Sequence, residues 1–286
     1  MKFSIKKPVI ISLLAVFPVL AFPCVSHASE LSSATENLSS STTELIEAKD
    51  SAAANVLSPE EELASRKKVV ADALSLSLKE VEAARTKLNS ANIEEESDLA
   101  TIRSSILEWL DLEEKYFKEA EDELTSDDLN LEEVKSLAKD VKAHRDESYN
   151  DNLTDALNFI FVLETSKLTD TANERWVRIN DDLQKIEKAG LIKKDLFVSE
   201  MAEARKMIDG ARALVERSFT IIREIYLPAP KEEAEMSAPI EDESVIAEEK
   251  IPSVKDLCSA AIVNLKSGYA EFIKISTAVK KLLKLP

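Results

Sequence analysis

The chain has 286 residues, with 37 basic and 54 acidic side chains and a formal net charge of −17. Its two histidines and two cysteines are too few for the usual zinc, di-iron or iron–sulfur sites, and three glycines leave no glycine-rich phosphate loop. The acidic total argues against nucleic acid as a partner, because such binding needs a basic surface. We therefore expect neither a cofactor nor a nucleic-acid ligand.

The first 28 residues have the pattern of a secretory signal peptide. Three lysines precede an apolar stretch over residues 8–22, and small residues then lead to a cleavage site between Ala28 and Ser29. The alternative is a retained membrane anchor, for which this proline-interrupted stretch is short. We predict cleavage and export, with the product periplasmic, envelope-associated or secreted.

Cleavage removes Cys24 and leaves Cys258 as the only cysteine of the exported chain, so no intramolecular disulfide is expected. Cys258 lies among apolar residues in a helical pattern, which is typical of a buried thiol. The alternative is an intermolecular disulfide between two copies in an oxidising compartment.

Residues 29–57 are rich in Ser, Thr, Ala and Glu and lack aromatic side chains, which predicts a disordered leader. The body follows over residues 58–227. Ser58, Pro59 and Glu61 match a helix start with a capping box, and no proline occurs again before residue 228. Further helix-start and turn signals occur near residues 92, 130 and 190, and apolar residues recur at helical spacing between them.

These patterns predict an all-α fold, an elongated antiparallel bundle of three to five long helices with coiled-coil-like heptads. An extended parallel coiled coil is the alternative, and the recurring cap and turn signals make it the weaker one.

Residues 228–252 contain four prolines and a run of acids, which predicts an extended linker. Residues 253–286 carry six lysines against two acids and predict a basic amphipathic helix. This helix could complete the bundle, lie on anionic lipid, or dock to an acidic or grooved protein partner, including a second copy. Its candidate contacts to a membrane or partner are Lys266, Phe272, Lys274, Lys280, Lys281, Leu282 and Lys284.

Catalytic motifs are not recognisable in this sequence. His144 lies in a polar run and is expected to be exposed, and acidic clusters such as Glu113-Glu114 are expected to be solvated helix faces. Trp109 and Trp176 fall on apolar stripes and are expected in the core. We therefore predict that the protein is not an enzyme.

Three functions remain as expectations from the sequence. The first is an exported, non-catalytic structural or interaction protein of the bacterial envelope or secreted, with a protein partner or self-association. The second is a peripheral membrane tether that uses residues 253–286. The third is a hydrolase of envelope polymers acting through paired carboxylates, for which no motif is present.

Overall fold

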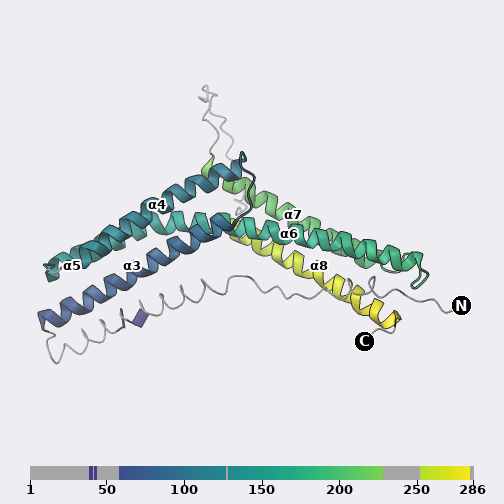
Figure 1. Cartoon of the computed structure of the whole chain (residues 1–286), viewed down its shortest axis with the longest axis horizontal. Coiled ribbons are helices and arrows are strands. Elements are labelled where there is room, and N and C mark those ends of the chain that lie inside the picture. The colour runs from purple at the N-terminus through teal and green to yellow at the C-terminus, as the bar shows by residue number, and fades with distance from the viewer. Residues whose placement is uncertain (1–38, 41, 44–57, 127, 228–251, 284–286) are drawn as a thin grey trace, which may run out of the picture. The chain divides into compact units, whose positions relative to one another are not determined.

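The structure is a computed structural model that describes residues 39–40, 42–43, 58–126, 128–227 and 252–283. All regular secondary structure in these ranges is helical (Figure 1), so the predicted all-α fold class is confirmed. The predicted signal peptide with its cleavage site, all but four residues of the leader, and all of the linker except Pro252 lie outside the described residues.

The chain divides into two compact units within helix α6 (Asn150–Lys188). The described part of the N-terminal unit ends at Ile160. It contains α3 (Pro59–Ser90), α4 (Asp98–Leu124), α5 (Leu131–His144), the π-helix η1 (Arg145–Tyr149) and the start of α6. The C-terminal unit contains the rest of α6 together with α7 (Val198–Tyr226) and α8 (Val254–Leu283). The sequence predicted one bundle over 58–227 and left open whether the tail helix completes it. The structure divides this segment between the two units and packs the tail helix against α7.

The helix starts follow local capping chemistry. Ser58 with Glu61 and Asn130 with Glu133 form reciprocal capping boxes, as predicted, at the starts of α3 and α5. The predicted helix start near Asn92 is wrong. Helix α4 begins at Asp98, where the Ser97 side chain accepts a hydrogen bond from the backbone N–H of Ala100.

The end of α6 confirms the turn predicted at Gly190. Gly190 has a φ of 69°, and the Leu191 N–H reaches back to the carbonyl of Ile186 at 3.1 Å. This is a Schellman termination, which favours glycine because a left-handed backbone is strained for residues with a Cβ.

The run from α5 into α6 contains one extra residue. The buried positions of α5 are Val134, Leu137 and Val141, and a regular continuation would place residues 144 and 148 on the same side. Because η1 is a π-helical turn, the buried position moves to Tyr149 instead. The sequence left open whether this polar run is helical, and the structure continues the helix through it.

Helices α7 and α8 pack antiparallel, side by side (Figure 1). A Cβ on Gly210 would lie 3.1 Å from the Asn264 amide, and one on Gly268 would lie 3.5 Å from the Ala204 carbonyl oxygen. Near the other end of the pair, Cys258 Sγ is 3.6 Å from Ser218 Oγ. Helix α8 therefore contributes a full buried stripe to the C-terminal unit: Leu257, Ala261, Leu265, Gly268, Phe272, Ile275 and Val279.

Two glycines give opposite expectations on replacement by alanine. Gly268→Ala is expected to raise the stability of the C-terminal unit by roughly 0.5–1 kcal/mol, because alanine is the better helix former. The added Cβ would meet its neighbours at ordinary contact distances, 3.5 Å and more. Gly190→Ala is expected to lower stability by about 1 kcal/mol, because its φ is positive. Thermal unfolding of the two variants checks this, and a gain from Gly190→Ala would contradict it.

Candidate functional site

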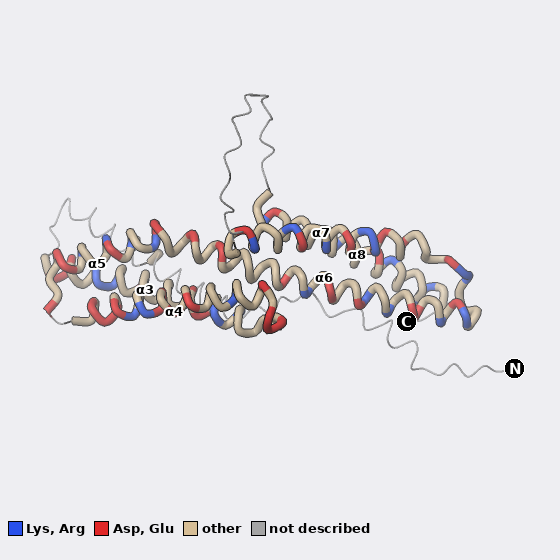
Figure 2. Tube along the Cα trace, turned by 90° about the horizontal axis from the view of Figure 1, so that it is seen from above, with Lys and Arg blue, Asp and Glu red and all other residues tan. Residues whose placement is uncertain are grey.

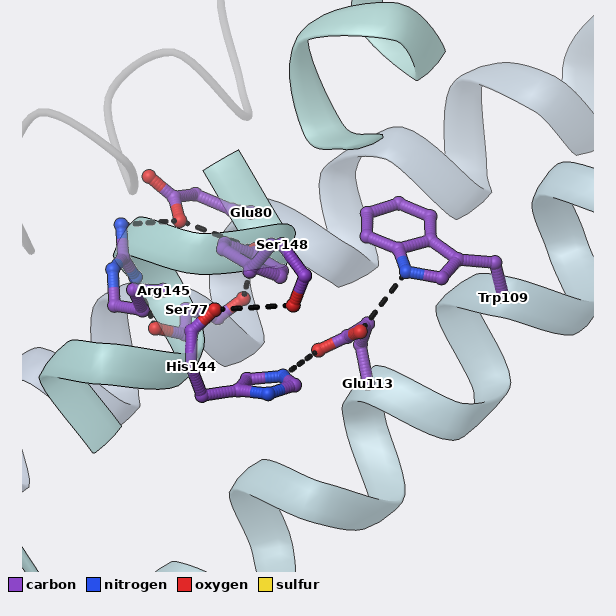
Figure 3. Close-up of polar contacts among 8 residues, drawn as sticks. Ser77, Glu80, Trp109, Glu113, His144, Arg145 and Ser148 are labelled. Carbon is purple, nitrogen blue, oxygen red and sulfur yellow. Dashed lines mark hydrogen bonds and ion pairs between the residues drawn. The ribbon is translucent and has the colours of Figure 1, made fainter. Parts of the chain in front are cut away.

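Glu113 on α4 is the one charged side chain among the buried described residues, with 6% of its surface exposed. Its Oε1 accepts a hydrogen bond from Trp109 Nε1 at 2.9 Å, and its Oε2 lies 2.6 Å from His144 Nε2 (Figure 3). The expectation that Glu113-Glu114 forms a solvated face is therefore wrong for Glu113. A buried carboxylate is tolerated only when hydrogen bonds replace its hydration, as they do here.

Spacing explains how a glutamate reaches this position. The buried residues of α4 include Ile106, Leu110, Phe117 and Ala120, and Glu113 fills the gap between the second and third of them. A polar residue on an apolar stripe was the signal in the sequence, and the seven-residue step from Leu110 to Phe117 concealed it.

The neighbouring glutamate has a different environment. Glu114 Oε2 lies 2.5 Å from Arg85 Nη1, and Lys118 also pairs with it. Hydrogen bonds from Lys118 and Arg85 lower the pKa of Glu114 below its ordinary value. It therefore stays ionised and links α4 to α3.

His144 is half-buried rather than exposed, which corrects the expectation from its polar surroundings. Its side chain is 26% exposed, and its ring lies 4.0 Å, centroid to centroid, from that of Tyr116. The contact to Glu113 joins the end of α5 to the middle of α4. The sequence does not reveal such a pair, because the two residues are 31 positions apart.

A second set of polar contacts joins η1 to α3. Together with the contacts of Glu113 it forms a polar cluster, whose members are Ser77, Glu80, Trp109, Glu113, His144, Arg145, Ser148 and Tyr149. Arg145 Nη2 lies 3.2 Å from Glu80 Oε2, and Arg145 Nη1 donates to Ser77 Oγ. The Tyr149 hydroxyl lies 3.2 Å from both the Ser77 carbonyl oxygen and Glu80 Oε2. Burial, followed by the negative charge of Glu80, raises the pKa of Tyr149 far above its ordinary value, so the phenol remains a neutral hydrogen-bond donor.

The cluster binds helices together rather than presenting a reactive group. The Ser148 hydroxyl bonds the backbone carbonyl of His144, and the Ser77 hydroxyl donates to the Ala73 carbonyl. Neither hydroxyl is hydrogen-bonded to the imidazole, as a serine nucleophile activated by histidine would be. The described residues contain no group of three or more His, Cys, Asp or Glu arranged to hold a metal ion. These contacts hold α3, α4, α5 and η1 at fixed positions along one another beside the π-helical turn.

Cys258 is completely buried between helices of the C-terminal unit. Burial raises the pKa of its thiol, while hydrogen bonds with Ser218 and Thr165 oppose that shift. A thiol without exposed surface cannot form the intermolecular disulfide considered as an alternative unless α8 separates from α7.

The Cys258 thiol is therefore expected to react with a thiol reagent only as fast as the C-terminal unit opens, because the reactive thiolate is both disfavoured and inaccessible. The measurement is labelling of the Cys24→Ser variant in native buffer and in denaturant. Ser259→Cys in a Cys258→Ala background is the matched control, since Ser259 is exposed and should react at once. Rapid native labelling of Cys258 would contradict the packing of α8.

Some of the candidate contact residues of the tail are buried in the structure and others are exposed. Phe272 is 1% exposed and belongs to the core, so it cannot contact lipid or a partner while α8 is packed. The described lysines at 266, 274 and 281 are exposed, Lys280 is intermediate, and Leu282 is 53% exposed. Lys284, like the cleavage residues Ala28 and Ser29, lies outside the described residues.

Comparisons with known protein families, with curated proteins and with solved structures find no match to this chain. Within the described ranges, no helix is both long enough and apolar enough to cross a bilayer.

Proposed function

We propose that the protein is an exported helical interaction protein that acts by binding rather than by catalysis. The observation that carries this proposal is the outward face of α8. Opposite its buried stripe, α8 exposes Val263 (60%) and Ile273 (43%) beside exposed lysines at 266, 274 and 281. A helix that packs through one side and presents mixed apolar and basic side chains on the other is suited to a binding surface.

The state of the reactive side chains supports a non-catalytic role. Glu113 and His144 bond each other between helices, and Cys258 is sealed in the C-terminal unit. In each case the group uses its hydrogen bonds to hold neighbouring helices together. Catalysis would instead need such groups to converge on a site that a substrate can enter.

Export rests on the N-terminal sequence pattern. If residues 1–28 are a signal peptide, N-terminal sequencing of the protein recovered outside the cytoplasm gives Ser29 as the first residue. Recovery of Met1 in that fraction would contradict cleavage, and recovery of the chain only from cytoplasm would contradict export.

Binding through α8 is tested by placing a photo-crosslinking amino acid at Val263 in cells that make the protein. The matched control is the same amino acid at Leu112 of the N-terminal unit, which is 68% exposed and also aliphatic. We expect a discrete adduct from position 263 that is absent at position 112. No adduct at 263, or the same adducts from both positions, would contradict the proposal.

A further inference from the structure

We infer that one end of the C-terminal unit docks onto the surface of an anionic phospholipid bilayer. This inference goes beyond the proposed function, because it concerns a different surface from the Val263 face of α8 and a different kind of partner. The surface, here called the basic end, is formed by the turn between α6 and α7 and by the last turns of α8. Its principal residues are Leu191, Lys193, Lys194, Lys280, Lys281 and Leu282.

The antiparallel register brings these segments together. Gly268 faces Ala204, so continuing the same register places Lys274 opposite Val198, the first residue of α7. Helix α8 continues to Leu283, and at about 1.5 Å per residue its last turns extend roughly 13 Å past that point, alongside the turn. Figures 1 and 2 both show the turn after α6 and the last turns of α8 at the same end of this unit.

The basic end combines accessible aliphatic side chains with accessible charge. Leu191 is 40% exposed and Leu282 is 53% exposed. Lys193, Lys194 and Lys281 are exposed as well, and no described carboxylate lies within ion-pair distance of these lysines or of Lys280. The turn also contains one acidic residue, Asp195. Its backbone N–H donates a hydrogen bond to Glu187 Oε1 at 3.1 Å, which ties the turn to the end of α6.

Helix-end electrostatics explains only part of this lysine cluster. Lys280 and Lys281 lie in the last turn of α8, where a cation offsets the negative end of the helix dipole. Lys193 and Lys194 instead precede the N-terminus of α7, where the dipole is positive and a cation is unfavourable.

Charge is distributed unevenly along the chain. Residues 58–160 carry 13 basic and 27 acidic side chains, a net of −14, whereas residues 161–227 with 252–286 carry 18 basic and 14 acidic ones, a net of +4. Residues 228–251, between α7 and α8, carry 2 basic and 8 acidic side chains, so the positive charge belongs to the helices and not to this connecting segment. An anionic surface would therefore attract the helices of the C-terminal unit and repel the N-terminal unit. Figure 2 shows basic positions along the turn from α6 to α7.

Lipid is favoured over an acidic protein surface because the leucines flank the lysines. Lysines bind lipid headgroups, and adjacent aliphatic side chains enter the boundary between headgroups and acyl chains. An acidic protein patch would satisfy the lysines and leave Leu191 and Leu282 without an apolar environment. The buried stripe of α8 remains in the core in this arrangement, so the helix need not unpack.

The test is co-sedimentation of the chain from Ser29 onward, which retains every described residue, with phosphatidylcholine vesicles that contain or lack phosphatidylserine. The test variant replaces Lys193, Lys194, Lys280 and Lys281 with Gln. The matched control replaces four other exposed basic residues of the same unit with Gln, at Lys167, Arg178, Lys206 and Arg217, and changes the net charge equally. Far-UV circular dichroism of all three proteins verifies that each remains helical.

The expected result is binding to phosphatidylserine vesicles alone, weakened at high salt and reduced at least about tenfold in the test variant but within about twofold in the control. Absence of binding, equal binding to both vesicles, or an equal loss in the control variant would overturn the inference. If position 263 gives an adduct in the crosslinking experiment and the protein does not bind vesicles, the result supports the proposed binding function and contradicts only the assignment of lipid as a partner.

Discussion

Replacing Phe272 with alanine is expected to destabilise the C-terminal unit by about 3–5 kcal/mol. The ring is 1% exposed on the buried stripe of α8, and it packs edge-on to Tyr269 at a centroid distance of 5.6 Å. Removing it leaves a cavity in a unit whose described part has only three helices and therefore few other layers to compensate. The same variant should leave the N-terminal unit unchanged, because that unit has its own core.

The two tryptophans allow this prediction to be measured unit by unit. Trp176 lies in the C-terminal unit, where its Nε1 donates to the Met201 carbonyl at 3.0 Å, and Trp109 lies in the N-terminal unit. Denaturant unfolding followed by fluorescence in Trp109→Phe and Trp176→Phe backgrounds therefore reports each unit separately. The matched control is Ile273→Ala, at the adjacent but 43% exposed position, with an expected cost below about 1 kcal/mol.

Equal effects of Phe272→Ala and Ile273→Ala would show that α8 is not packed as described. In that case the tail would be available as an amphipathic membrane helix, which was one of the expectations from the sequence. A midpoint shift in both units would instead show that the two units do not unfold independently.

Replacing Glu113 with alanine is expected to destabilise the N-terminal unit by about 2–3 kcal/mol. The change leaves Trp109 Nε1 and His144 Nε2 without the carboxylate oxygens that now lie 2.9 and 2.6 Å away. Buried polar groups without partners retain their desolvation cost, which is the main source of the loss. Glu113→Gln should cost less, because its amide oxygen can still accept from one of the two nitrogen donors.

The measurement is the unfolding midpoint of the N-terminal unit, followed by Trp109 fluorescence in the Trp176→Phe background. Glu119→Gln on the same helix is the matched control, because this side chain is 67% exposed and makes only a long contact to Lys115 at 3.8 Å. Its expected effect is within about 0.5 kcal/mol. Equal stability of Glu113→Ala and the parent would contradict a structural role for the cluster.

The helices could be predicted because their signals are local. A capping box such as Ser58 with Glu61 uses atoms three residues apart, and Gly190 ends α6 through the backbone of its own turn. The buried residues of α7 could also be predicted from their spacing in the sequence, because one side of the helix packs against the rest of the unit.

The polar cluster could not be predicted, because its members belong to four elements, α3, α4, α5 and η1. Glu113 falls on the apolar stripe of α4, but its place on that stripe does not show that Trp109 and His144 satisfy its carboxylate. His144 lies in a stretch rich in charge, and nothing local separates it from its polar neighbours. The π-helical turn at Arg145–Tyr149 shifts the buried side of the chain by one residue and places Tyr149 in the core. That shift depends on how α3 and α4 pack against it.

The sequence alone therefore determines an all-α protein with an acidic N-terminal part and a basic final helix, because composition, caps and periodicity are properties of neighbouring residues. Only the tertiary structure decides that α8 belongs to the C-terminal unit, that Phe272 is core, and that Glu113 is buried. The physical reason is that the burial of one side of an amphipathic helix depends on the partner helix that covers it. That partner can be distant in sequence, as α7 is from α8 across residues 228–251.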